Sequence, residues 1–397
     1  MDISRRNFFR QIAVGAAVTA SPWHLDKLSQ VASQDRSSSR QSSEPIRLDM
    51  NINPNGPSPK VVEAIRANLG SVNKYPDSDY LPLAERIADF HKITPNEVTL
   101  SCGSREVLRM AAAAFLSRHK TLVLASPSFG HVADLAKRAD AQVIAVPLDK
   151  YYAHDLNAML RHTNASTGLV YICNPNNPTG SLTPRKDLEE FFQKLPPKLA
   201  VVIDEAYHEY VGPSSEYASF IDHPIHDNRL IVVRTFSKMY GLAGLRLGYA
   251  VSSKETSLKL SSMQLERGLN IVATRAAAAA LDDSEYVRQS SKRNVDDRQE
   301  FYNQTNGRML RQVDSHTNFV LMNTGLPSSQ VIEHFGRNNI VLGRAVPLMD
   351  KYVRVAISTK ENMKEFWRVW NLQPPHPHKM ATARDPAAPN REEGVSL

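Results

Sequence analysis

The sequence has few cysteines and no block of charge of one sign, and each shortage argues against a class of protein. Cys102 and Cys173 are the two cysteines in 397 residues, too few for a disulfide framework. No Cys/His spacing indicates a metal site. The net charge of +7 is spread along the chain and forms no basic stripe with interleaved aromatic residues. We therefore expect no nucleic-acid partner, and the positive balance suits an anionic small molecule equally well.

The sequence also lacks an internal repeat and an apolar run long enough for a stable membrane span. The weakly apolar run at 12–20 is too short to cross a bilayer. It follows SRRNFFR at 4–10, which resembles the twin-arginine export consensus. We expect residues 1–45 to be a twin-arginine signal and linker, and the protein to be exported to a periplasm-like compartment. A basic amphipathic helix is the alternative, and it would leave the protein in the cytoplasm.

Short apolar runs alternate with helical patterns between residues 99 and 251. Such near-continuous apolar strands predict an α/β fold with a mainly parallel sheet covered by helices on both faces. The strand-like runs are 121–125, 142–146, 169–173, 200–204, 230–234 and 248–251. The helical patterns are 104–117, 130–139, 184–194 and 254–280.

The pattern changes beyond residue 281 to a longer helix followed by strand-like runs, which predicts a smaller α+β domain. The last residues are rich in proline, alanine and charge, a composition typical of disorder. The expected parts are the signal and linker at 1–45, an N-terminal segment packing with the small domain at 46–72, the large domain at 73–280, the small domain at 281–373 and a disordered tail at 374–397.

Polar side chains follow three predicted strands at their carboxyl ends. NPNNPTG at 174–180, DEAY at 204–207 and TFSK at 235–238 stand there, and CGSR at 102–105 precedes a predicted helix. Ligands of open α/β sheets gather at this edge, so we expect the four groups to converge on one crevice. Each group alone is also ordinary turn or cap chemistry. Their order and spacing together favour a site.

Four stretches jointly resemble the fold-type-I pyridoxal-phosphate (PLP) aminotransferases, and most of all the histidinol-phosphate aminotransferase group. They are NPNNPTG, DEAYHEY, SKMYGLAGLRLGY at 237–249 and GRAVPLMDKYVRVAIST at 343–359. The resemblance runs from about residue 48 to 359. It implies a large PLP-binding domain, a smaller α+β domain, and transfer of an amino group from a small-molecule donor to a 2-oxo acceptor.

The resemblance implies a role for each polar residue near the cofactor ring. Lys238 would bond covalently to the cofactor and later move the substrate's α-proton, since apolar surroundings and nearby cations favour a neutral amine. Asp204 would meet the pyridine nitrogen and keep it protonated. Asn177 and Tyr207 would reach the ring hydroxyl. Phe129 stands where the family stacks an aromatic side chain, and a core aromatic is the alternative.

The resemblance also implies a phosphate site built from a helix start, hydroxyls and a cation. Backbone N–H groups at the start of a helix point at an anion, and an arginine can grip two oxygens at once. The expected phosphate-binding residues are Gly103, Ser104, Arg105, Thr235, Ser237 and Arg246.

The remaining expectations concern the neighbouring subunit and the substrate. Tyr75 resembles a family tyrosine that reaches the phosphate from the other subunit, which implies a homodimer with shared sites. Arg354 and Arg344 resemble arginines that hold the substrate's carboxylate or phosphate, with Asn53 beside the substrate. Ordinary structural ion pairing is the alternative for both arginines.

The segment NINPNG at 51–56 departs from the family pattern. Ile52 stands where the family has an acidic residue and Asn55 where it has an aromatic one, and both normally lie near the substrate. The resemblance therefore supports an aminotransferase more firmly than a particular substrate such as histidinol phosphate. Decarboxylation of a phosphorylated amino acid and a non-catalytic PLP-fold binding protein stay as alternatives.

Overall fold

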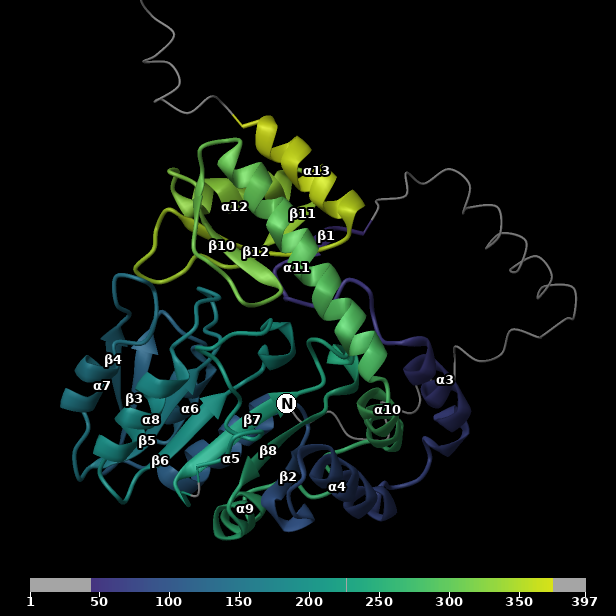
Figure 1. Ribbon diagram of the computed structural model, residues 1–397, viewed down its shortest axis with the longest axis vertical. Coiled ribbons are helices and arrows are strands. Elements are labelled where there is room, and N and C mark those ends of the chain that lie inside the picture. The colour runs from purple at the N-terminus through teal and green to yellow at the C-terminus, as the bar shows by residue number, and fades with distance from the viewer. Residues whose placement is uncertain (1–43, 226, 374–397) are drawn as a thin grey trace, which may run out of the picture. The chain divides into compact units, whose positions relative to one another are not determined.

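The computed structural model describes residues 44–225 and 227–373. The predicted signal and linker, apart from residues 44 and 45, and the predicted tail at 374–397 lie outside the described residues. Figure 1 shows the large domain and, above it, the small one. None of the helices that the structure describes is long and apolar enough to cross a membrane.

The large domain is built on a seven-stranded sheet in the order β2-β8-β7-β6-β5-β3-β4. The strands from β4 to β7 are parallel to their neighbours, whereas β8 is antiparallel to β7 and β2. This confirms the predicted α/β fold with a mainly parallel sheet. The bounds are β2 Val98–Ser101, β3 Thr121–Ser126, β4 Gln142–Pro147, β5 Thr167–Cys173, β6 Ala200–Asp204, β7 Leu230–Thr235 and β8 Gly248–Ser252.

Helices cover both faces of this sheet and bury two apolar cores. On β6, Val201 and Ile203 enter one core, while Ala200 and Val202 enter the other. The alternation follows from the two-residue period of a strand, and it explains why the strands read as continuous apolar runs. One face packs on α3 Pro59–Asn68, α4 Asp77–His91, α7 Leu156–Arg161, α8 Arg185–Lys194 and α10 Ile271–Leu281; the other packs on α5 Ser104–Phe115, α6 His131–Arg138 and α9 Lys254–Ser261.

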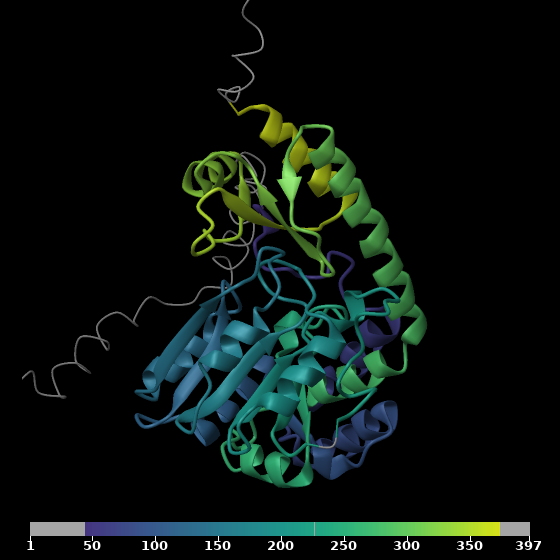
Figure 2. The ribbon, with the colours of Figure 1, turned by 60° about the vertical axis from the view of Figure 1, so that its left-hand side comes forward.

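The small domain contains the antiparallel sheet β12-β10-β9 and three helices around a third core. In both Figure 1 and Figure 2, the long helix α11 runs alongside both domains. The strand β1, Ile46–Leu48, pairs in parallel with β11, whereas α3 packs against α10 of the large domain. The other bounds are α11 Ser284–Asn306, β9 Arg311–Gln312, β10 Phe319–Asn323, α12 Ser328–Arg337, β11 Ile340–Leu342, β12 Tyr352–Ala356 and α13 Lys360–Asn371.

The prediction of one continuous helix at 254–280 was wrong. The structure has two helices, α9 and α10, with an irregular segment between them. Arg267 in that segment has a left-handed backbone with φ of 53°, which interrupts a helix. Asn270 then caps α10, since its side chain accepts a hydrogen bond from the backbone N–H of Ala273 at 2.8 Å.

Candidate active site

The carboxyl ends of β5, β6 and β7 bring the predicted polar residues to one edge of the sheet. Asp204 is the last residue of β6, and it pairs in register with Cys173 of β5 and Val233 of β7. Asn177 lies in the turn after β5, and Lys238 lies in the loop after β7. The convergence expected from the strand order is therefore present.

Asp204 is a buried carboxyl group with two hydrogen-bond donors. The Tyr171 hydroxyl donates to Oδ2 at 2.9 Å and the backbone N–H of Ala206 donates to Oδ1 at 3.1 Å. Burial raises the pKa of Asp204 to about 6, and the two hydrogen bonds oppose that rise. Such a group can pair strongly with a protonated ring nitrogen, because the pairing offsets the cost of its burial.

Lys238 lies in a setting that favours its neutral amine. Its Nζ donates a hydrogen bond to the carbonyl oxygen of Met50 at 2.9 Å. Burial, together with the nearby guanidinium groups of Arg354, Arg105 and Arg246, lowers its pKa to about 7. A lysine with such a pKa is neutral in about half of the molecules at pH 7, so it can act as a nucleophile or a base.

The hydroxyl of Tyr207 is the centre of a polar cluster that links the two domains. The side-chain amides of Asn51 and Asn177 donate to its oxygen at 3.0 and 3.2 Å. Arg354 on β12 of the small domain donates through Nη1 to Asn177 Oδ1 at 2.7 Å and through Nη2 to the Asp49 carbonyl. Burial raises the pKa of Tyr207, which keeps its proton on the oxygen.

Arg246 packs directly against the start of α5. Gly103 there has φ of +77°, and a Cβ atom added to it would lie 2.1 Å from Arg246 Nη2. Arg246 is held by hydrogen bonds from Nη1 to Ser237 Oγ at 3.2 Å and to the Ala243 carbonyl at 3.0 Å. A guanidinium group and a helix start this close together form a site for an anion. Ser104 and Arg105 are the first two residues of that helix.

The other predicted residues differ in how they relate to this cluster. Thr235 ends β7, and its Oγ1 accepts a hydrogen bond from the backbone N–H of Ser237 at 3.1 Å. Phe129 is half-buried, with the Arg105 guanidinium carbon 5.7 Å from its ring centre. Asn53 is buried and donates to the Met239 carbonyl at 2.7 Å.

Tyr75 and Arg344 are exposed, and the structure does not bring them into the bonded cluster. The ring of Tyr75 instead lies beneath Arg267, whose guanidinium carbon is 4.9 Å from the ring centre. Among the described residues of one chain, no contact places Tyr75 or Arg344 at the site.

Asn51 and Tyr171 are polar residues of the cluster that the sequence prediction missed. Tyr171 interrupts the apolar run LVYIC with a single hydroxyl, and this was a signal for a buried partner. Asn51 and Asn53 are buried whereas Ile52 between them is exposed, the reverse of what their polarity indicates, so the sequence held no signal for Asn51.

A buried ion-pair cluster fixes the loop behind Asp204. Arg234 Nε lies 3.0 Å from Glu205 Oε2, and its Nη2 donates to Ser219 Oγ at 2.8 Å. Glu205 directly follows Asp204 in the chain, and Arg234 directly precedes Thr235. The paired charges therefore hold two strand ends together beneath the site, and a buried pair of this kind is costly to break.

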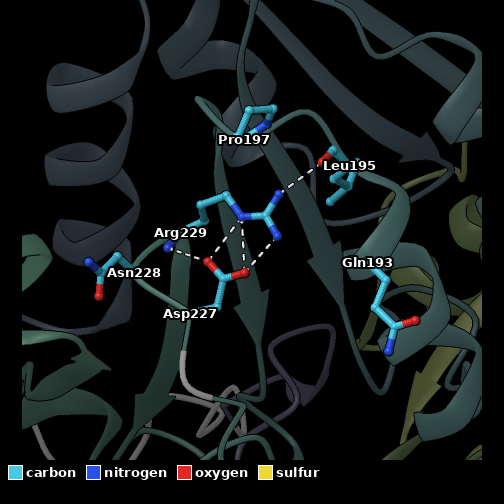
Figure 3. Close-up of a pocket in the computed structure, with 6 residues that line it drawn as sticks. All are labelled: Gln193, Leu195, Pro197, Asp227, Asn228 and Arg229. Carbon is cyan, nitrogen blue, oxygen red and sulfur yellow. Dashed lines mark hydrogen bonds and ion pairs between the residues drawn. The ribbon is translucent and has the colours of Figure 1, made fainter.

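A surface cavity of about 560 Å³ lies at the opposite, amino end of the sheet strands (Figure 3). Arg229, which precedes β7, fills its hydrogen-bonding capacity with Asp227 and with backbone carbonyls such as that of Leu195, 3.0 Å from Nη1. The cavity therefore lies away from Lys238.

Among the described residues, no group of three or more His, Cys, Asp or Glu side chains could hold a metal ion.

Comparison with known proteins assigns the chain to a family. Residues 43–369 match the family model described as aminotransferase class I and II, and the chain belongs to that family. It is therefore a PLP-dependent aminotransferase, as its sequence resemblance implied.

Its relatives include histidinol-phosphate aminotransferases. The chain is 36% identical over 315 residues to histidinol-phosphate aminotransferase 2 of Carboxydothermus hydrogenoformans, covering 79% of this chain and 86% of the relative. The histidinol-phosphate aminotransferase structure from Clostridium acetobutylicum has a TM-score of 0.75 and 25% identity, covering 82% and 98% of the two chains. The one from Sinorhizobium meliloti, in complex with pyridoxal-5'-phosphate, has a TM-score of 0.78 and 24% identity, covering 90% and 96%.

Proposed function

We propose that the protein transfers an amino group between an anionic amino-acid or amino-phosphate donor and a 2-oxo acid, with Lys238 as the group that moves the proton. The observation that carries this proposal is the Lys238 amine, with a pKa near 7, in one cluster with Asp204, Tyr207 and Arg354. When bound, PLP supplies an aldehyde that joins an amine and a ring that accepts electrons.

The residues present fit that cofactor. Gly103 leaves room for Arg246 beside the start of α5, which suits a phosphate group, with Ser104, Arg105, Thr235 and Ser237 as the neighbouring donors. This cradle supports the fit because a side chain at position 103 would fill it.

Each ring-facing residue of this chain then has a defined task. Asp204 would hold the proton on the ring nitrogen, and Tyr207 and Asn177 would fix the ring oxygen. Lys238 would move the proton that leaves the substrate's α-carbon. Phe129 would cover one face of the ring. Arg354 orients the substrate by binding its carboxylate.

The substrate class is proposed from charge and from the relatives. Arg354 favours a donor with an anionic group, and histidinol phosphate is one such candidate. Ile52 and Asn55 are exposed near this edge and differ from the family pattern, so a different phosphorylated or dicarboxylic donor suits the site equally well.

A half-reaction screen tests this proposal. Amino acids and histidinol phosphate are added singly to the PLP-loaded protein, and loss of the visible absorbance band reports amino-group transfer to the cofactor. We expect bleaching with at least one anionic donor and release of the matching oxo compound. Carbon dioxide release without any oxo product would instead support decarboxylation.

A homodimer with shared sites is proposed from the exposed face around Tyr75. Tyr75 is 72% exposed, and Val72, Leu81 and Leu69 beside it in the chain are 64%, 61% and 54% exposed. Apolar surface of this kind is typical of an interface. Refolding the Tyr75→Ala and Lys238→Ala variants together tests the shared sites. Random pairing of the two chains would make about a quarter of all active sites intact. No recovery of activity would contradict shared sites.

Export through the twin-arginine route is proposed from SRRNFFR and the short apolar run after it. A fusion of residues 1–45 to a reporter should move the reporter out of the cytoplasm, and exchange of Arg5 and Arg6 for lysine should stop it. A reporter that stays in the cytoplasm with the unchanged sequence would contradict export.

A further inference from the structure

A short segment at 49–53, which we call the N-terminal strap, is bonded to the active-site cluster by consecutive residues. Its backbone carbonyls accept hydrogen bonds from side chains that belong to both domains. Arg354 Nη2 donates to the carbonyl oxygen of Asp49, and Lys238 Nζ donates to that of Met50 at 2.9 Å. Asn318 Nδ2 donates to the carbonyl oxygens of Asn51 and Ile52 at 3.0 and 3.2 Å. The strap is therefore fixed relative to the site.

Asn51 is held in the strap with its side chain turned inward. It is 2% exposed, and its backbone has φ of 51°, in the left-handed region. Among residues other than glycine, asparagine and aspartate tolerate this conformation best. The position therefore accepts few residue types, and asparagine is the one among them that adds an amide donor.

The side-chain amide of Asn51 matters because of the bonding capacity of Tyr207. A phenol oxygen accepts two hydrogen bonds and donates one. Asn51 Nδ2 lies 3.0 Å and Asn177 Nδ2 lies 3.2 Å from the Tyr207 oxygen. Arg354 Nη1 bonds to Asn177 Oδ1 at 2.7 Å, which turns the NH₂ group of Asn177 toward Tyr207. Two amide donors thus fill both acceptor positions.

We propose that Asn51 is a positioning residue, which together with Asn177 saturates the acceptor capacity of Tyr207 and commits its O–H to donate to the cofactor's ring oxygen. This inference rests on the proposed function, because it assumes that PLP lies at this cluster. With either amide donor removed, the hydroxyl can rotate and its proton is shared among other directions.

The inference predicts a shift in a spectroscopic titration. Donation to the ring oxygen draws electron density from it and weakens its hold on the proton of the neighbouring Lys238 nitrogen. Loss of that donation should raise the pH midpoint of the visible absorbance band of the PLP-loaded protein. We expect Asn51→Gly, which keeps the left-handed backbone, to raise the midpoint by roughly half to one pH unit and to weaken PLP binding about fivefold.

The Asn51→Asp variant tests whether the amide donor of Asn51 matters, because it removes the donor and keeps the size of the side chain. The aspartate has nearly the same size and the same backbone tolerance, but its carboxylate accepts a hydrogen bond and cannot donate one. Tyr207 would then give its proton to the carboxylate, so the midpoint should rise at least as far as in Asn51→Gly. A midpoint equal to that of the unchanged protein would mean that Asn51 accepts from Tyr207, and it would overturn the proposal.

A double-mutant cycle completes the test. In a Tyr207→Phe background, Asn51→Gly should not move the midpoint further, since the two residues act through one hydroxyl. Asn338→Gly is the matched control, because this half-buried amide bonds to the His334 carbonyl at 2.9 Å in the small domain. The control should leave the pH midpoint of the absorbance band unchanged, even if it changes the temperature of thermal unfolding.

The outcomes distinguish this inference from the proposed function. If the unchanged protein shows no PLP band that depends on Lys238, the proposed function fails. If the band is present but both Asn51 variants titrate as the unchanged protein does, the role of Asn51 alone is overturned. Asn51→Asp is measured whether or not Asn51→Gly is soluble, so one of the two variants decides the question.

Discussion

Arg354 Nη1 lies 2.7 Å from Asn177 Oδ1, and this hydrogen bond joins β12 of the small domain to the turn after β5 of the large domain. Burial lowers the pKa of Arg354 but leaves the guanidinium charged, since an arginine does not lose its proton in a protein. Arg354 Nε is a buried donor with no hydrogen-bond partner among the described residues. A guanidinium group has five N–H donors, so the side chain keeps donors available for a further acceptor.

We expect Arg354→Ala to raise KM for carboxylate substrates by roughly 10- to 100-fold, the effect of removing a hydrogen bond to a charged group. The dissociation constant for PLP should change much less. Steady-state kinetics and a PLP titration measure the two effects. Arg368→Ala is a suitable control, because Arg368 pairs with Glu365 on the exposed face of α13. Equal KM values for the two variants would remove Arg354 from the substrate site.

Lys238→Ala should abolish the visible absorbance band and multiple-turnover activity. In the unchanged protein, the rate of covalent PLP attachment should rise through about pH 7, because burial and three nearby arginines lower the pKa of Lys238 to about 7. An ordinary lysine would show the rise near pH 10. Stopped-flow absorbance at a series of pH values measures the midpoint. A midpoint near 10 would contradict the role of burial.

Gly103→Ala should weaken PLP binding by about tenfold or more. The added Cβ atom would collide with Arg246 Nη2, and the left-handed backbone at φ of +77° adds strain of about 1–3 kcal/mol. Gly212→Ala is the matched control, since nothing lies within 4 Å of the Cβ atom there. Equilibrium dialysis measures PLP affinity, and thermal unfolding measures stability. Equal affinity in the two variants would exclude the cradle at the start of α5.

Stability should fall as the pH drops from about 6.5 to about 4. Burial lowers the pKa of His154 to about 4, and its buried Nε2 has no hydrogen-bond partner in the described part of the chain. The unfolded state therefore binds the proton first as the pH falls, and His154 costs as much as about 3 kcal/mol of unfolding free energy by pH 4.

Urea unfolding at several pH values between 7.5 and 4.5 measures this dependence. His154→Gln should flatten it, because glutamine does not titrate. The exposed His162→Gln should leave it as it is. The contribution of His154 is absent if the His154→Gln curve runs parallel to that of the unchanged protein.

The sequence was sufficient for six of the seven strands of the large sheet, all but β2, and for the residues at its edge, for a physical reason. Asp204, Asn177 and Lys238 follow strands whose apolar runs are read directly, and parallel strands end at one edge. Asn51 was harder to predict, because its partner Tyr207 is 156 positions away and the strap between β1 and α3 has no regular pattern. The break between α9 and α10 was missed because the apolar spacing on both sides continues across it, while the backbone does not.

The strap also limits how the chain can be processed at its N-terminal side. Ile46–Leu48 pairs with β11, and the carbonyls from Asp49 to Ile52 are occupied by side chains of the site. A protease that cuts ahead of residue 46 leaves this arrangement complete. A cut after residue 50 would remove β1 from the small domain and the carbonyl acceptors of Lys238 and Arg354 together, so the site depends on a chain that is intact from residue 46.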